Sequence, residues 1–136
     1  MTILEQLKRD EGLQLTPYKD SVGKLTIGYG RNLDDVGIST EEASSLLLND
    51  IERTTNDLSK HLPWIASMDS ARQGVLLNMA FNIGIYGLLG FKKFLVLCEA
   101  MSYTDASEEM LNSKWAEQVG ARGHRLSLQM RSGEWQ

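Results

Sequence analysis

The sequence is poor in cysteine, proline and basic residues. Cys98 is the only cysteine among 136 residues, so no disulfide can form within the chain. Because it follows the apolar run Phe94-Leu95-Val96-Leu97, we expect a buried small hydrophobic side chain and not a reactive thiol. The 14 basic residues are outnumbered by 18 acidic ones. The sequence has no basic patch that would indicate nucleic-acid binding. Residues 1–60 hold eleven acids and seven bases, so the acidic excess belongs to the first part of the chain.

Long apolar runs are absent as well. A membrane-spanning helix needs about 20 apolar residues in a row, and no stretch approaches that length. Residues 1–20 are charged and lack the apolar region of a secretory signal. We therefore expect a protein made in the cytoplasm without a signal peptide. Any target outside the cytoplasm then requires a separate route of release.

The composition that is present is typical of one globular domain. Apolar residues make up 42% and charged residues 24% of the chain, without repeats or low-complexity segments. A chain of this length hides roughly two-thirds of the surface that it exposes when unfolded, which is enough for a hydrophobic core. We therefore expect a single domain over residues 1–136.

A short helix and a hairpin are predicted at the start of the chain. The apolar residues of positions 3–11 share one face of a helix, which Gly12 ends. Thr16-Pro17 excludes a continued helix, because proline lacks the N–H donor and restricts the residue before it. Residues 21–24 include a glycine and predict a hairpin turn. Apolar residues then alternate with small ones over residues 25–30, as in a strand.

The rest of the chain is predicted to be helical. Ser39 and Glu42 have the spacing of a capping box at a helix start. Apolar residues recurring every three or four positions then predict the longest helix, over about residues 40–60, before Pro63. We expect this helix to join two lobes, with an ordinary packing helix as the alternative. Further helices are predicted over residues 69–83, 91–100, 105–113, 115–118 and 125–131.

These elements predict an α+β fold that is mostly helical. Helices and a small hairpin that each hide one apolar face pack into layers around a shared core. We expect a small lobe of about residues 13–60 that bears the hairpin. A helical lobe of residues 1–12 and 61–136 would face it across a cleft.

Three oxygen-bearing side chains lie on the first helix and the hairpin. Glu11 ends the helix, Asp20 lies at the edge of the turn, and Thr26 lies in the strand. A pair of carboxylates is what cleavage of a glycosidic bond requires, one as acid and one assisting at the anomeric carbon. Taken alone, however, this spacing favours a solvated helix-end glutamate and a turn aspartate with only local hydrogen bonds.

The residues that follow these side chains make the pattern more specific. Glu11, Asp20 and Thr26, with Ile27-Gly28-Tyr29-Gly30 directly after, resemble the catalytic stretch of the phage-type lysozymes (endolysins, glycoside hydrolase family 24). The resemblance implies a lysozyme-like two-lobed fold without a cofactor or a metal. It also implies a muramidase that hydrolyses the β-1,4 bond between N-acetylmuramic acid and N-acetylglucosamine. Glu11 would be the general acid, Asp20 the assisting carboxylate, and Thr26 a holder of the attacking water.

The resemblance carries over further positions. It implies a salt bridge between Arg122 and Glu11, and it allows an Arg31–Asp50 pair where many members pair a histidine with the acid. Trp115 would pack near the cleft. The residues that it implies in substrate binding are Gly30, Asn32, Phe81, Asn82 and Gln118.

The sequence departs from the family at two places. The family usually has Thr-Pro before the arginine that corresponds to Arg122, whereas this chain has Val119-Gly120-Ala121, which aims the arginine less firmly. The small lobe also lacks a strand and a helix that the longest members have after residue 33. We expect this shortening to remove some sugar subsites.

Two other functions stay open at this point. A lytic transglycosylase needs no attacking water and therefore no Asp20, and a wall-binding module needs no catalysis at all. Under the favoured interpretation the partner is the glycan strand of peptidoglycan, with no nucleic acid and no stable membrane insertion. We expect a monomer that leaves the host cytoplasm through a holin.

Overall fold

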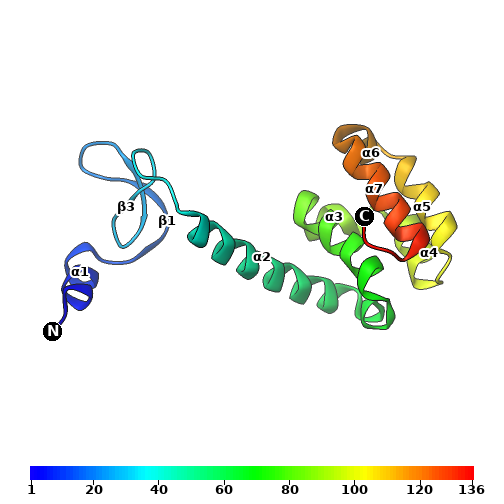
Figure 1. The fold of residues 1–136 in the computed structure, drawn as a ribbon, viewed down its shortest axis with the longest axis horizontal. Helices are drawn as coiled ribbons and strands as arrows, with labels where there is room; N and C mark the ends of the chain where they lie inside the picture. Colours follow the sequence, from blue (N-terminus) through cyan, green and yellow to red (C-terminus); the bar gives the residue numbers. More distant parts are fainter. The chain divides into compact units, whose positions relative to one another are not determined.

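The computed structural model describes all 136 residues as seven α-helices, one 3-10 helix and a three-stranded sheet (Figure 1). The predicted α+β, mostly helical class is confirmed. The elements in chain order are α1 (Ile3–Glu11), β1 (Gln14–Lys19), β2 (Leu25–Gly28), β3 (Arg31–Asn32), α2 (Thr40–His61), η1 (Pro63–Ser67), α3 (Ser70–Leu89), α4 (Lys92–Glu99), α5 (Tyr103–Leu111), α6 (Lys114–Val119) and α7 (Ala121–Ser132).

The chain divides into two compact units, Met1–Leu46 and Leu47–Gln136. This division differs from the predicted lobes, because it groups α1 with the sheet and falls inside α2. The start of α2 belongs to the first unit, where Glu42 in the first turn of the helix is paired with Arg31 on β3.

The first unit is built from α1, the sheet and the first turns of α2. A capping box between Thr2 and Glu5 begins α1. The sheet has the order β1-β2-β3 with antiparallel neighbours, and Tyr18 pairs with Thr26 in its first hairpin. The predicted turn of this hairpin is present, with Gly23 at φ +85°. Since only one residue of this unit is buried, the sheet depends on backbone and turn hydrogen bonds more than on a core.

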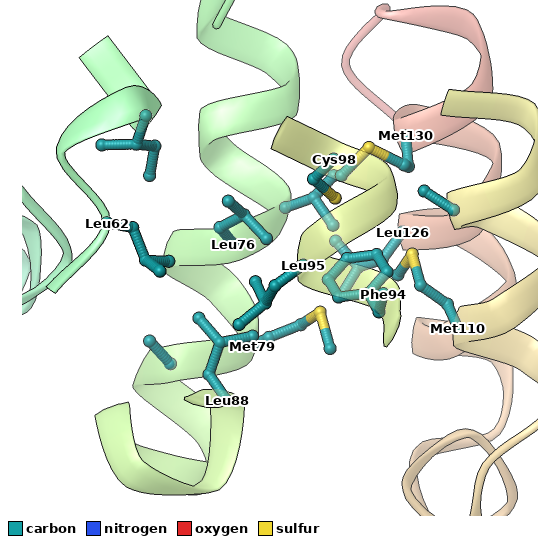
Figure 2. Close-up of a cluster of buried hydrophobic side chains, with 14 of the residues drawn as sticks. Leu62, Leu76, Met79, Leu88, Phe94, Leu95, Cys98, Met110, Leu126 and Met130 are labelled. Atoms are coloured by element: carbon teal, nitrogen blue, oxygen red, sulfur yellow. The ribbon is translucent and has the colours of Figure 1, made fainter. Parts of the chain in front are cut away.

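The second unit contains the hydrophobic core. Helices α3, α4, α5 and α7 enclose it, and Figure 2 shows its side chains interdigitating between them. Cys98 is 1% exposed within this core, and burial raises the pKa of its thiol to about 12. The predicted role of Cys98 as a buried hydrophobic residue is therefore confirmed. The core side chains that are less than 2% exposed include Val75, Leu76, Met79, Leu88, Phe94, Met110 and Met130.

Helix α3 is longer than predicted. The sequence predicts that it ends at Gly84, but the chain resumes helical turns up to Leu89 after a kink at this glycine, where φ is +80° and ψ is +161°. The helix is apolar on most sides because it lies in the middle of the core. No single helix is long and apolar enough to span a membrane. Helices α3 and α4 together have the required length and composition, but the pair is bent by 104°.

Candidate functional site

Glu11 is the last residue of α1, and its carboxylate lies against the turn after β2. The backbone N–H of Gly12 donates to the carbonyl of Lys8 at 3.1 Å and ends the helix there. A Cβ atom at Gly30 would lie 2.8 Å from Oε2 of Glu11. Gly30 also has φ +79°, a conformation that side chains other than glycine rarely adopt. The absence of a side chain at Gly30 therefore makes the space that the Glu11 carboxylate occupies.

Asp20 and Thr26 are brought together by one backbone carbonyl. The N–H of Asp20 and the hydroxyl of Thr26 both donate to the carbonyl oxygen of Lys24, each at 2.9 Å. The Oδ1 atom of Asp20 accepts hydrogen bonds from the N–H groups of Val22 and Lys24, which fixes the carboxylate in the turn. The hairpin thus ties the backbone of Asp20 and the hydroxyl of Thr26 to one carbonyl, and it fixes the Asp20 carboxylate in the adjoining turn.

These bonds determine what the two groups can offer a ligand. The hydroxyl proton of Thr26 is committed to the Lys24 carbonyl, so its oxygen is left as an acceptor. Thr26 is only 3% exposed, whereas Asp20 is partly exposed. The Thr26 oxygen and the Oδ2 atom of Asp20, which has no partner within the protein, can each accept a hydrogen bond from a water molecule. The structure contains no group of three or more side chains placed to hold a metal ion.

Asn32, which the resemblance assigns to substrate binding, is engaged within its own loop. Its Nδ2 donates to the carboxylate of Asp35 at 3.0 Å, and its Oδ1 accepts from the backbone N–H of the same residue at 2.9 Å. One amide hydrogen and one lone pair stay free for another partner.

The predicted Arg31–Asp50 pair is corrected by the structure. Arg31 pairs with Glu42 at 2.7 Å, and Asp50 pairs with Arg53 at 2.9 Å. The physical reason is the position along α2, because Glu42 lies in its first turn beside β3. Asp50 lies eight residues further on, about 12 Å along the axis. The bond with Arg31 and the N–H of Ser39 together lower the pKa of Glu42 to about 2.

The second unit holds the other predicted substrate-binding residues. Phe81 is 46% exposed although it belongs to the central helix α3, and Gln118 on α6 is exposed. Asn82 accepts a hydrogen bond from the indole N–H of the buried Trp115 at 3.0 Å, which fixes the orientation of its amide. The amide N–H₂ of Asn82 is therefore turned away from that contact and free to donate.

Arg122 is held by a neighbour within its own unit. Its Nε and one terminal nitrogen both donate to Oδ1 of Asn78, at 2.9 and 2.6 Å. The two bonds to one oxygen fix the guanidinium group although Gly120, at φ +56°, lies where the resemblance leads us to expect a proline. The pairing of Arg122 with Glu11 stays a prediction. A pocket of about 260 Å³ next to this contact is lined by Leu47, Ile51, Gly74, Leu77, Asn78, Phe81, Arg122 and Trp135.

The sequence alone does not predict the hydrogen-bonding partners of the two arginines at this site. Asn78 holds Arg122, and Glu42 holds Arg31. The signal for Glu42 was present, because its capping-box position already places its carboxylate at the helix start. No local signal points to Asn78, which lies 44 residues before the arginine that it binds.

Comparison with known proteins gives one consistent match. The family described as phage lysozyme matches residues 8–132. "Probable T4-type lysozyme 1" and "Probable T4-type lysozyme 2" of Dictyostelium discoideum are 28% and 32% identical to the chain. The alignments cover 97% and 92% of this chain and 95% and 91% of the relatives. The "Pre-baseplate central spike protein Gp5" of Enterobacteria phage T4 is 28% identical over 98% of this chain and 28% of its own length.

Proposed function

Because the chain belongs to the phage lysozyme family, we propose that it is an endolysin-type muramidase that lyses bacterial cells. Family membership supports lysozyme-like hydrolysis of peptidoglycan. The proposed bond is the β-1,4 linkage between N-acetylmuramic acid and N-acetylglucosamine. The proposed route to the wall is release from the host cytoplasm through a holin.

The observation that carries the proposal is the arrangement of three oxygen-bearing groups within the first unit. The Lys24 carbonyl accepts hydrogen bonds from the Asp20 N–H and the Thr26 hydroxyl, and the space at Gly30 accommodates the Glu11 carboxylate. Each group is thereby held by an element of secondary structure or a turn, which fixes its direction before substrate binds.

In the proposed reaction, Glu11 protonates the glycosidic oxygen of the leaving sugar. A water molecule that donates to Asp20 and to the free lone pairs of Thr26 attacks the anomeric carbon from the opposite face. Glu11 gives its proton to the leaving oxygen, and Asp20 takes one from the attacking water, so the total number of protons on the two carboxyl groups is unchanged. Direct attack by water inverts the anomeric configuration, which requires the two carboxyl groups to lie roughly 6.5 to 9.5 Å apart.

The second unit would contribute substrate contacts in this proposal. The exposed ring of Phe81 offers an apolar face to a sugar, and the free amide hydrogens of Asn82 suit the carbonyl of an N-acetyl group. Gln118 offers a further amide from α6.

The proposal is tested by lysis of purified cell walls with Glu11→Gln. The amide keeps the shape of the side chain but cannot donate the leaving-group proton, so lysis should be abolished while the thermal unfolding midpoint is kept. Asp10→Asn is the matched control, since it makes the same change at the adjacent exposed carboxylate and should leave lysis intact. Lysis at the normal rate by folded Glu11→Gln would refute the assignment.

The products then separate the remaining functions. Mass spectrometry should find reducing muramic acid ends, whereas anhydro ends would indicate a lytic transglycosylase. Wall binding without any cleavage would indicate a wall-binding module. NMR of the first-formed product should show an inverted anomeric configuration, and retention would contradict the role of Asp20 and Thr26.

A further inference from the structure

A second contact joins the same two segments as Glu11 and Gly30. The ammonium nitrogen of Lys8 lies 5.6 Å from the ring centroid of Tyr29, within the range of a cation–π interaction. Lys8 is one helical turn before Glu11 on α1, and Tyr29 directly precedes Gly30. We call the space beside Gly30 that the Glu11 carboxylate occupies its seat. The cation–π contact and this seat are therefore two adjacent contacts between the end of α1 and the turn after β2.

Few other contacts hold the end of α1 in place. None of the nine residues of this helix is buried. Glu11 is the last helical residue, at a position where helices fray because carbonyl groups lack partners. The Gly12 N–H caps the carbonyl of Lys8, so beyond the backbone bonds of the helix and this cap, the position of the last turn relative to the sheet depends on what its side chains touch. A contact one turn earlier is thus well placed to decide where the Glu11 carboxylate lies.

We propose that Lys8 and Tyr29 are positioning residues for Glu11. Their cation–π contact holds the last turn of α1 against the turn at Gly30, so that the carboxylate occupies the space left by the missing side chain. Neither residue touches the reacting atoms. The inference rests on the proposed function, in which Glu11 is the general acid.

The expected size of the effect follows from the strength of such contacts. An exposed cation–π pair contributes enough to change an equilibrium by about two- to fivefold. Breaking it should lower the fraction of molecules whose Glu11 carboxylate lies at Gly30, and with it kcat, by up to that factor, the full loss being reached when this state becomes the minor one. KM should be unchanged, because the proposed sugar contacts come from other residues. A residue with a merely structural role would lower the amount of folded protein and leave kcat per folded molecule unchanged.

The kinetic test is a double-mutant cycle of Lys8→Met and Tyr29→Leu. Each single variant should lose kcat by up to about fivefold, and the double variant should lose no more than either one. Lys8→Arg and Tyr29→Trp preserve a cation and an aromatic face, so they should keep the wild-type kcat. Arg9→Met is the matched control, because it removes the neighbouring charge, which is paired with Asp10. Additive losses in the double variant would overturn the proposal.

A second measurement does not depend on activity. In the free protein, the nuclear Overhauser effect between the γ protons of Glu11 and the α protons of Gly30 reports the seat directly. It should weaken equally in Lys8→Met, in Tyr29→Leu and in the double variant. If the wild type cleaves no glycan but the signal weakens in this way, the proposed function fails and the positioning role stands. An unchanged signal in both single variants would refute the positioning role even in an active enzyme.

Discussion

At Gly30, two independent requirements exclude a side chain. The residue has a positive φ of +79°, and a Cβ atom there would lie 2.8 Å from Oε2 of Glu11. Gly23 has the same kind of backbone, at φ +85°, but a Cβ atom there would have nothing within 4 Å. The two glycines therefore separate the cost of backbone strain from the cost of displacing the carboxylate.

We predict that Gly30→Ala and Gly23→Ala lose similar stability but differ in activity. Each should lower the free energy of unfolding by about 1 to 2 kcal/mol, the cost of a left-handed conformation for a residue with a Cβ atom. Only Gly30→Ala should also lower wall lysis, by about 100-fold, since displacement of a catalytic group by about 1 Å has an effect of that order. Urea unfolding and lysis rates per folded molecule measure both quantities. Equal lysis by the two variants would show that the Gly30 contact does not position Glu11.

The sequence predicts single residues well where the cause is local. The positive φ at Gly23 follows from the turn pattern, and the burial of Cys98 follows from the apolar run before it. The apposition of Gly30 and Glu11 is different, because it joins residues 19 positions apart that no periodicity relates. Glycines at positions 28 and 30 of a strand pattern indicate either close backbone approach or sharp bending, and only the structure identifies the Glu11 carboxylate as the group that lies against Gly30.

At the scale of elements, the start of α2 is fixed by charge as well as by capping. Glu42 accepts hydrogen bonds from the N–H of Ser39 and from Arg31, and these lower its pKa to about 2. A carboxyl group with a lowered pKa in the folded state stabilises the fold above its ordinary value, near 4.5. That contribution is lost as the pH falls from about 4.5 toward 2.

We therefore predict that the stability difference between the wild type and Glu42→Gln depends on pH. The wild type should be more stable at neutral pH, and the difference should shrink between about pH 4.5 and pH 2 as Glu42 takes up a proton. Urea unfolding at a series of pH values measures it. Glu41→Gln is the control, because it makes the same change at an exposed neighbour in the same turn of α2 that has no salt bridge. A constant difference for Glu42→Gln would contradict the pairing with Arg31.

Element boundaries were predictable where the sequence gives a start or stop signal. The capping box of Ser39 and Glu42 is present, and α2 ends two residues before Pro63 as the pattern indicates. The predicted end of α3 at Gly84 was wrong, because this glycine introduces a kink without ending the helix. The start of α7 was predicted four residues late, since Gly123 weakens the pattern but is buried within the helix.

At the scale of the whole molecule, the two Dictyostelium relatives are longer than this chain. The alignments with the two Dictyostelium lysozymes extend over 162 and 154 positions, whereas this chain has 136 residues. The fold class and the family follow from the sequence because the patterns that define them extend over most of the chain. The grouping of α1 with the sheet could not be predicted, because the apolar face of a short helix does not specify which unit it joins.

The net charge of −4 gives a last prediction about the whole molecule. Bacterial walls are anionic, so like-charge repulsion should slow the encounter with the substrate, and salt should screen that repulsion. The screening length falls from about 30 Å at 0.01 M to about 10 Å at 0.1 M. Wall lysis should therefore become faster over this range, whereas cleavage of a neutral soluble oligosaccharide should not change. Glu52→Lys with Glu99→Lys brings the net charge from −4 to zero at two exposed positions without salt bridges, and this variant should lyse walls with little dependence on salt. A wild-type lysis rate that falls steadily with added salt would show that a local basic surface, and not the net charge, governs the encounter.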